Sequence, residues 1–184
     1  MFCDFVSSGS TFYFKRTYLS TSQWSNKSWV EAKHSIGANS TDKFNKNDFF
    51  IGLDGLHELA SQANYTKRVL LLDLSVPIHG VVHYFDFNVG PESSNYTVNY
   101  SRFESDYGSV ENELNSANGP TVFSTMDHDP NGCAALKGAA GWYNSECTGL
   151  SLFADPLYWT INNVSRVMQV VAFGLYRQSG FYGE

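Results

Sequence analysis

The amino-acid sequence predicts one α+β domain with a mixed, mostly antiparallel sheet, a few short helices and a loop-rich C-terminal lobe. Three observations support this fold class. Aromatic residues make up 16% of the 184 residues, and aromatic side chains favour strands and bury large areas. The segment Arg68–Leu74 is nearly continuously apolar, as is typical of a central strand buried on both faces. Between Glu104 and Pro120 the pattern gives way to acidic, Asn- and Gly-containing loop.

The N-terminal third contains an early strand around Phe12–Phe14 and two short helices. The first helix is capped by Ser25 or Asn26 and extends through Ile36. Its inward-facing residues follow helical spacing: Trp29, Ala32 and Ile36. The polar segment 38–47 indicates an exposed loop. The apolar run Phe49–Leu53 leads into the second helix, Gly52–Ala60.

Three further segments have the composition of strands. They are Val81–Val89, Tyr96–Phe103 after a turn at Gly90-Pro91, and Val164–Arg177, which forms a strand pair or one long strand. Neither a linker nor an internal repeat interrupts the sequence, so residues 1–184 are expected to form a single domain.

Charge and hydropathy narrow the function classes. The formal net charge is −6 and no Lys/Arg cluster is present, so a nucleic-acid backbone would be repelled. The longest apolar stretch, Val167–Tyr176, is interrupted by Gln169 and is shorter than the roughly 20 residues that span a bilayer. We therefore expect neither a nucleic-acid partner nor a membrane span.

Six Asn-x-Ser/Thr sequons indicate an extracellular glycoprotein. They are Asn26, Asn39, Asn64, Asn95, Asn99 and Asn163. On a strand, Asn95, Thr97 and Asn99 would share one face, and Tyr96, Val98 and Tyr100 the opposite face. This separates a face suited to glycans from a face suited to a core. An amphipathic strand without glycans remains the alternative.

The first residues, Met1–Phe5, have no basic region followed by an apolar region, so they do not form a signal peptide. The chain is either a trimmed segment of a secreted protein or a cytosolic chain. We favour the trimmed segment.

Cys133 and Cys147 bracket a segment that contains Trp142, Tyr143 and Asn144. A disulfide closing a loop of this size would stabilise the fold by roughly 3 kcal/mol. Two unpaired core cysteines are the alternative. A disulfide is favoured in a chain rich in sequons.

Five short motifs occur in a characteristic order. They are Phe2-Cys3-Asp4, Phe50–Leu53 with Leu56-His57, Val89–Tyr96, Phe123–Asp129, and Cys133 through Trp142-Tyr143-Asn144 to Cys147. In this order the sequence resembles the fibrinogen C-terminal (fibrinogen-related) domain of fibrinogen chains, ficolins, tachylectins, angiopoietins and tenascins. The resemblance implies the fold of the fibrinogen C-terminal domain and a Cys133–Cys147 disulfide. It also implies that Cys3 pairs with a cysteine in an N-terminal segment that this chain lacks, with a buried free thiol as the alternative.

The resemblance implies a calcium site at the acidic turn after Phe123. The ligands would be the Asp127 and Asp129 carboxylates and the Asn131 carbonyl. Calcium takes about 6–8 oxygen ligands. Here only Pro130–Gly132 separate Asp129 from Cys133, a shorter loop than that of the family. A solvated acidic turn is the alternative.

The resemblance also implies a ligand pocket beside this loop, as in the family's lectins. Its residues would be Tyr143, Cys147, Thr148, Tyr158 and Trp159. Thr148 replaces a histidine that often follows the second cysteine in the family, which weakens the prediction of acetyl-sugar specificity. Trp142 is interpreted as core packing.

The five histidines do not indicate an enzyme. His79 and His83 have metal-like spacing. On a strand, however, four residues span about 13 Å, which is too far for both side chains to bind one ion. No catalytic motif is present. The sequence therefore predicts a secreted recognition module that binds a partner protein or a glycan, as in adhesion and receptor-ligand members. A calcium-dependent lectin for acetylated sugars in innate defence is the alternative, and a hydrolytic enzyme is a third hypothesis of another class. Upstream regions would mediate any oligomer.

Overall fold

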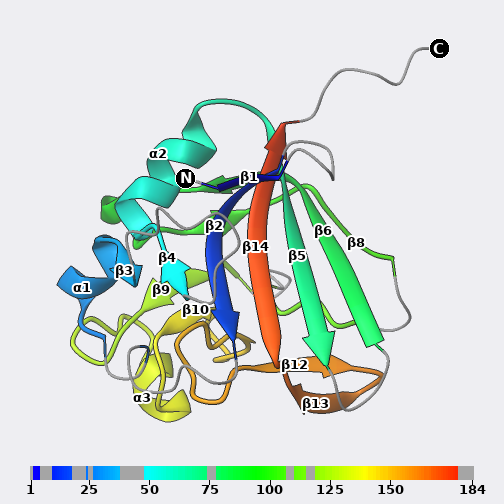
Figure 1. Ribbon diagram of the computed structural model, residues 1–184. Coiled ribbons are helices and arrows are strands. Elements are labelled where there is room, and N and C mark those ends of the chain that lie inside the picture. The colour runs from blue at the N-terminus through cyan, green and yellow to red at the C-terminus, as the bar shows by residue number, and fades with distance from the viewer. Residues whose placement is uncertain are drawn as a thin grey trace.

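The computed structural model describes residues 2–4, 10–17, 24, 27–37, 48–73, 78–106, 110–114 and 119–177. Its main element is a twisted sheet, which runs through the middle of the molecule in Figure 1. The hydrogen-bonded order is β3-β4-β2-β14-β5-β6-β7, with β1 on β2 and β8 on β6. All of the strand pairs described in this sheet are antiparallel. This confirms a mostly antiparallel sheet, but the parallel pairs of a mixed sheet do not occur among the described strands.

The bounds of the main-sheet strands are as follows. They are β1 Phe2–Asp4, β2 Ser10–Thr17, β3 Ile36–Gly37, β4 Phe49–Phe50, β5 Tyr65–Asp73, β6 Ile78–Val89, β7 Val98–Asn99, β8 Arg102–Ser105 and β14 Val170–Arg177. The last strand, β14, lies between the early strand β2 and β5 (Figure 1). Among the described strands, the two halves of the sheet are therefore joined only by β14, which comes near the C-terminal end of the chain.

The central strand predicted from Arg68 is β5, which pairs with both β14 and β6. It begins three residues earlier, at Tyr65, and so includes Lys67. Val69 and Leu71 are buried on its inner face. On the opposite face Thr66 is fully buried, whereas Leu74 and the side chains of Arg68, Leu70 and Leu72 lie outside what the structure describes.

The first helix, α1, is shorter than predicted and spans Trp29–Lys33. Ser28 rather than Ser25 or Asn26 caps it, because the Ser28 hydroxyl accepts the Glu31 amide while the Glu31 carboxylate accepts the Ser28 amide. The prediction that Ile36 belongs to this helix is wrong, since Ile36 pairs with Phe50 in the sheet. The helix α2, Leu53–Ser61, confirms the second predicted helix to within a residue.

The predicted strand Tyr96–Phe103 is divided. A short 3-10 helix, Glu92–Ser94, precedes it, and Asn95 and Tyr96 adopt left-handed backbone conformations. Only β7 and β8 are extended. The predicted separation of faces holds in part, because Tyr96 and Val98 are buried whereas Asn99 is exposed.

The C-terminal lobe contains a three-stranded sheet in the order β11-β10-β9 and a hairpin, β12–β13. Its elements are β9 Val122–Ser124, α3 Cys133–Lys137, β10 Gly141–Tyr143, β11 Gly149–Leu150, β12 Tyr158–Ile161 and β13 Val164–Val167. Val164–Arg177 is therefore two strands, as in one of the predicted alternatives, but β13 and β14 belong to different sheets.

The Cys133–Cys147 disulfide joins the start of α3 to the turn after β10, with 5.0 Å between the Cα atoms. Cys133 is fully buried with Ala134 and Tyr143 in a small cluster apart from the main core. This confirms the predicted bridge. Because the lobe has only short elements, it buries little apolar area. The disulfide supplies stability that longer elements would gain from burial.

Aromatic rings connect the lobe to the main sheet. Phe14 stacks on Phe173 at 4.8 Å between ring centroids and lies 5.4 Å from Trp24. Phe153 lies 5.8 Å from Trp24 and 5.9 Å from Phe123. All five rings are fully or almost fully buried. One continuous core therefore runs from sheet to lobe.

Removing the disulfide should lower the stability of the whole domain. We expect the double variant Cys133→Ser/Cys147→Ser to lose about 3 kcal/mol of unfolding free energy, because the reduced chain regains loop entropy when unfolded. Urea denaturation measures the loss. The wild type in a reductant should approach the variant, and equal stability of variant and oxidised wild type would contradict a stabilising bridge.

Phe14 should be a principal anchor of the shared core. Phe14→Ala is expected to cost about 3–5 kcal/mol, since it removes a ring buried against three others. The control is Val164→Ala at a half-exposed position of β13, where a change within about 0.5 kcal/mol is expected. Similar losses for the two variants in urea denaturation would disprove the assignment.

Candidate functional site

A cleft of about 320 Å³ lies within the C-terminal lobe (below also called the disulfide lobe), between its disulfide-bonded part and its β12–β13 hairpin. Its lining comes from the end of α3 and the two residues after it, from β11 and Ser151, from residues 154–156, from both strands of the hairpin, and from Glu113. The lining residues with polar, charged or aromatic groups are Glu113, Lys137, Ser151, Asp155, Tyr158, Thr160 and Ser165. The cleft therefore offers charges of both signs and one aromatic face.

Tyr158 and Trp159, both predicted in the ligand pocket, lie on β12 in different surroundings. Tyr158 is 48% exposed and lines the cleft. Trp159 is fully buried, and its indole N–H donates to the Glu111 carbonyl at 3.1 Å. Successive strand residues face opposite sides, so only one of the pair can reach a ligand. Trp159 is therefore a core residue, and the prediction that it forms a wall of the site is wrong.

Tyr143 lies behind the cleft rather than in it. The ring is fully buried, and its hydroxyl lies 2.7 Å from the Ala139 carbonyl and 2.9 Å from the Ser151 hydroxyl. Ala139 and Ser151 both line the cleft. Burial raises the pKa of Tyr143 to about 12, so it stays protonated and supports the lining. Trp142 is also buried, as its interpretation as core packing requires.

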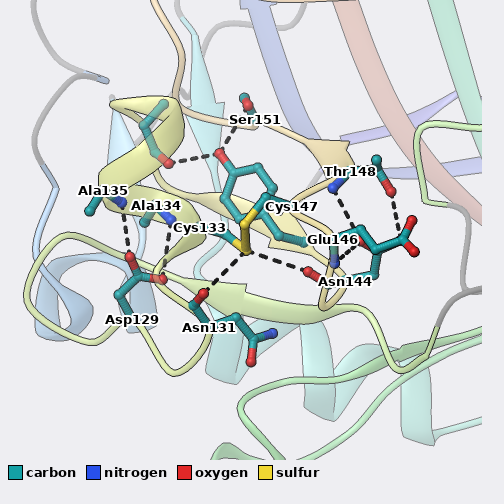
Figure 2. The surroundings of a disulfide bond; sticks show 12 residues. Asp129, Asn131, Cys133, Ala134, Ala135, Asn144, Glu146, Cys147, Thr148 and Ser151 are labelled. Carbon is teal, nitrogen blue, oxygen red and sulfur yellow. Dashed lines mark hydrogen bonds between the residues drawn. A yellow bond between two sulfur atoms is a disulfide. The ribbon is translucent and has the colours of Figure 1, made fainter.

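Asn144 shapes the turn that carries Cys147 and Thr148 (Figure 2). Its carboxamide oxygen accepts the amides of Glu146 and Thr148, and its nitrogen donates to the Thr148 hydroxyl at 2.6 Å. These bonds hold Cys147 in a left-handed conformation with φ of 56°. Thr148 is exposed, but neither Thr148 nor Cys147 lines the cleft.

Arg16 links the main sheet to one wall of the cleft. It is 4% exposed, and its guanidinium donates to the Ala154 carbonyl and to Asp155 Oδ1, the latter at 3.0 Å. Both residues line the cleft, as does Pro156, which follows a cis peptide bond. Burial lowers the pKa of Arg16, but an arginine remains charged at neutral pH.

Glu113 provides a partly buried carboxylate in the cleft lining, next to Thr160 of the hairpin. Its Oε1 accepts the Thr160 amide at 2.8 Å, and burial raises its pKa although the hydrogen bond with Thr160 acts in the other direction. The sequence pattern did not predict four of the lining residues: Glu113, Lys137, Asp155 and Pro156. Only the Asp-Pro dipeptide carried a recognisable turn signal.

The two aspartates of the predicted calcium loop bind backbone amides. Asp127 Oδ1 accepts the Trp29 amide at 2.9 Å and the Thr125 hydroxyl at 2.7 Å. These hydrogen bonds outweigh the opposing effect of burial and lower the pKa of Asp127.

Asp129 accepts the amides of Ala134 and Ala135 at the start of α3 (Figure 2). Within the described residues, no three His, Cys, Asp or Glu side chains gather as metal ligands would. Two carboxylates already occupied by amides fit calcium poorly. Calcium binding here stays a prediction.

Four of the six sequons lie within the described residues. Asn64, Asn99 and Asn163 are exposed. Asn95 is half-buried, and its side-chain oxygen lies 2.8 Å from Nε2 of His128. Asn26 and Asn39 lie outside the described residues. Glycosylation stays a prediction at all six.

Solved structures similar to this chain share its fold. The fibrinogen-like globe domain of human ANGPTL2 matches with a TM-score of 0.74 at 22% identity, covering 96% of this chain and 85% of that domain. A lamprey fibrin D-dimer complexed with the peptide Gly-His-Arg-Pro-amide matches with a TM-score of 0.75 at 20% identity, covering 99% of this chain and 67% of that one.

Sequence comparisons agree with the fold. Human angiopoietin-related protein 3 is 27% identical over 150 residues, which cover 80% of this chain and 30% of that protein. Mouse microfibril-associated glycoprotein 4 is 30% identical over 156 residues, which cover 79% of this chain and 56% of that protein. This chain thus spans only part of the length of these relatives.

The family model for the C-terminal globular domain of fibrinogen beta and gamma chains matches residues 1–170. This match covers the main sheet up to the start of β14, the disulfide and the cleft. The chain therefore belongs to the fibrinogen C-terminal domain family.

Proposed function

We propose that this chain is an extracellular recognition module that binds a segment of a partner protein in the cleft of the disulfide lobe. The observation that carries the proposal is the position of Tyr158, an aromatic ring 48% exposed in a cleft whose other walls are polar and charged. Membership of the fibrinogen family, a disulfide and exposed sequons support an extracellular location.

The charges of the cleft favour a peptide as its ligand. Lys137 offers a cation and Glu113 a carboxylate, whereas the Asp155 carboxylate is already paired with Arg16. A peptide segment presents charged, amide and apolar groups together and can match all of these. The similar lamprey fibrin was solved with a short peptide ligand, which is consistent with a peptide-sized site in this fold.

A lectin for acetylated sugars is less favoured. That hypothesis needed Tyr143 and Trp159 as walls of a pocket, and both rings are buried. Tyr158 alone could still stack on a sugar ring, so glycan binding is kept as an outcome of the test below. We infer no enzymatic activity, since fibrinogen-like domains act as binding modules. Among the described residues, no helix has the length and apolar character of a membrane span.

Tyr158 should determine binding in the cleft. Peptides selected on the wild-type domain from a displayed library are expected to bind Tyr158→Ala at least about tenfold more weakly, as truncated aromatic hot spots do. The matched control is Leu136→Ala, which removes an apolar side chain that is 73% exposed and outside the cleft lining. It should leave affinity unchanged in calorimetry.

Two results would overturn the proposal. Selected peptides that bind the wild type and Tyr158→Ala equally would place recognition outside the cleft. Selection of no peptide, together with retention on a glycan array that free N-acetylglucosamine reverses, would establish the lectin hypothesis instead.

Calcium binding is tested separately by thermal unfolding. If the loop takes calcium, about 1 mM Ca²⁺ should raise the melting temperature, as for extracellular calcium modules, and a chelator should reverse the rise. Asp127→Asn and Asp129→Asn should abolish it, since each removes a charge but keeps an oxygen acceptor for the amides. A melting temperature insensitive to calcium would eliminate the prediction.

A further inference from the structure

Lys67 places an amine in the core of the molecule. It lies on β5 opposite Tyr84 of β6, and none of its surface is exposed. Its Nζ is surrounded by four aromatic rings, with ring centroids at 4.3 Å for Phe173, 5.1 Å for Phe87, 5.2 Å for Tyr84 and 5.9 Å for Trp142. Because Trp142 belongs to β10, the amine lies at the joint between the main sheet and the disulfide lobe.

The Lys67 amine has no hydrogen-bond partner among the residues that the structure describes. A buried ammonium ordinarily needs acceptors or a counter-ion to offset its loss of hydration. The faces of aromatic rings attract cations, but this attraction is smaller than the cost of removing an ammonium from water. The surroundings of Lys67 therefore suit an uncharged amine.

The titratable groups around Lys67 supply no negative charge. Tyr84 faces it from β6, and Tyr13 of β2 interacts with Tyr84. Burial raises the pKa of both phenols well above their ordinary value, so both stay neutral. Glu113 interacts with Tyr84 and not with Lys67, while the rings from β14 and β10 carry no charge. Burial accordingly lowers the pKa of Lys67 well below its ordinary value.

We propose that Lys67 makes the joint between the main sheet and the disulfide lobe sensitive to protons. The amine is held uncharged between the rings, and its protonation separates them, so that the lobe loosens as the pH falls. The module is then firmest at alkaline pH and becomes progressively weaker as the pH falls through neutral values.

The direction of the pH dependence follows from linkage. In the unfolded chain a lysine keeps a pKa of about 10.4, whereas the folded value is lower. Between the two values the unfolded chain binds more protons, so stability rises with pH. The folding equilibrium constant falls by up to about tenfold for each pH unit lost across this window, and the effect levels off below the folded pKa.

The proposal is tested by urea denaturation of the wild type and Lys67→Met at pH 6, 7, 8 and 9. Met fills a similar volume without a titratable group, so the variant should be more stable at low pH. Its advantage should shrink by up to about tenfold per pH unit as the pH rises. Lys137→Met, at an exposed position on α3, is the control and should differ from the wild type by a constant factor. A constant factor for Lys67→Met as well would overturn the proposal.

Two measurements do not depend on variant stability alone. The ¹³Cε resonance of Lys67 in the wild type should titrate well below the ordinary pKa of a lysine, and titration at the ordinary lysine pKa would overturn the proposal even if Lys67→Met fails to fold. Hydrogen exchange at pH 6 should be faster in the wild type than in Lys67→Met at the amides of Gly141–Tyr143. Equal rates there would contradict the loosening of the lobe.

Discussion

The continuous aromatic packing between the main sheet and the C-terminal lobe is the constraint on which the rest of the structure depends. The elements of the lobe are at most five residues long and are too short to form a core of their own. Phe153 and Phe123 instead extend the ring contacts that begin at Phe14 and Trp24 in the sheet half. Aromatic rings suit this role because each buries a large area from a single position.

The geometry of the candidate site depends on this packing between the main sheet and the C-terminal lobe. The disulfide and the Asn144 hydrogen bonds hold the segments next to the lining residues Lys137 and Gly149, and Arg16 holds the wall at Ala154 and Asp155. Tyr158 lines the cleft from a hairpin whose next residue, Trp159, is anchored in the core. A candidate site built mainly of loops thus rests on buried supports.

Regular elements with a clear hydrophobic pattern were predictable, and irregular ones were not. The apolar and aromatic composition of Phe12–Phe14, Arg68–Leu74 and Val81–Val89 located β2, β5 and β6. The helix ending at Ile36 was wrong because pairing with Phe50 outweighs helical spacing. The small strands of the lobe had no periodic signal, since two to four residues are too few to show one.

The sequence by itself determined the family, the antiparallel sheet and the Cys133–Cys147 bridge, because motif order and cysteine spacing are properties of the chain alone. Only the tertiary structure decided which residue of an alternating pair faces a cleft, as for Tyr158 and Trp159. It also decided that Lys67, at a position where a lysine is ordinarily solvated, is enclosed by rings from β6, β10 and β14. Burial depends on segments far apart in sequence, and no local pattern encodes which of them will meet.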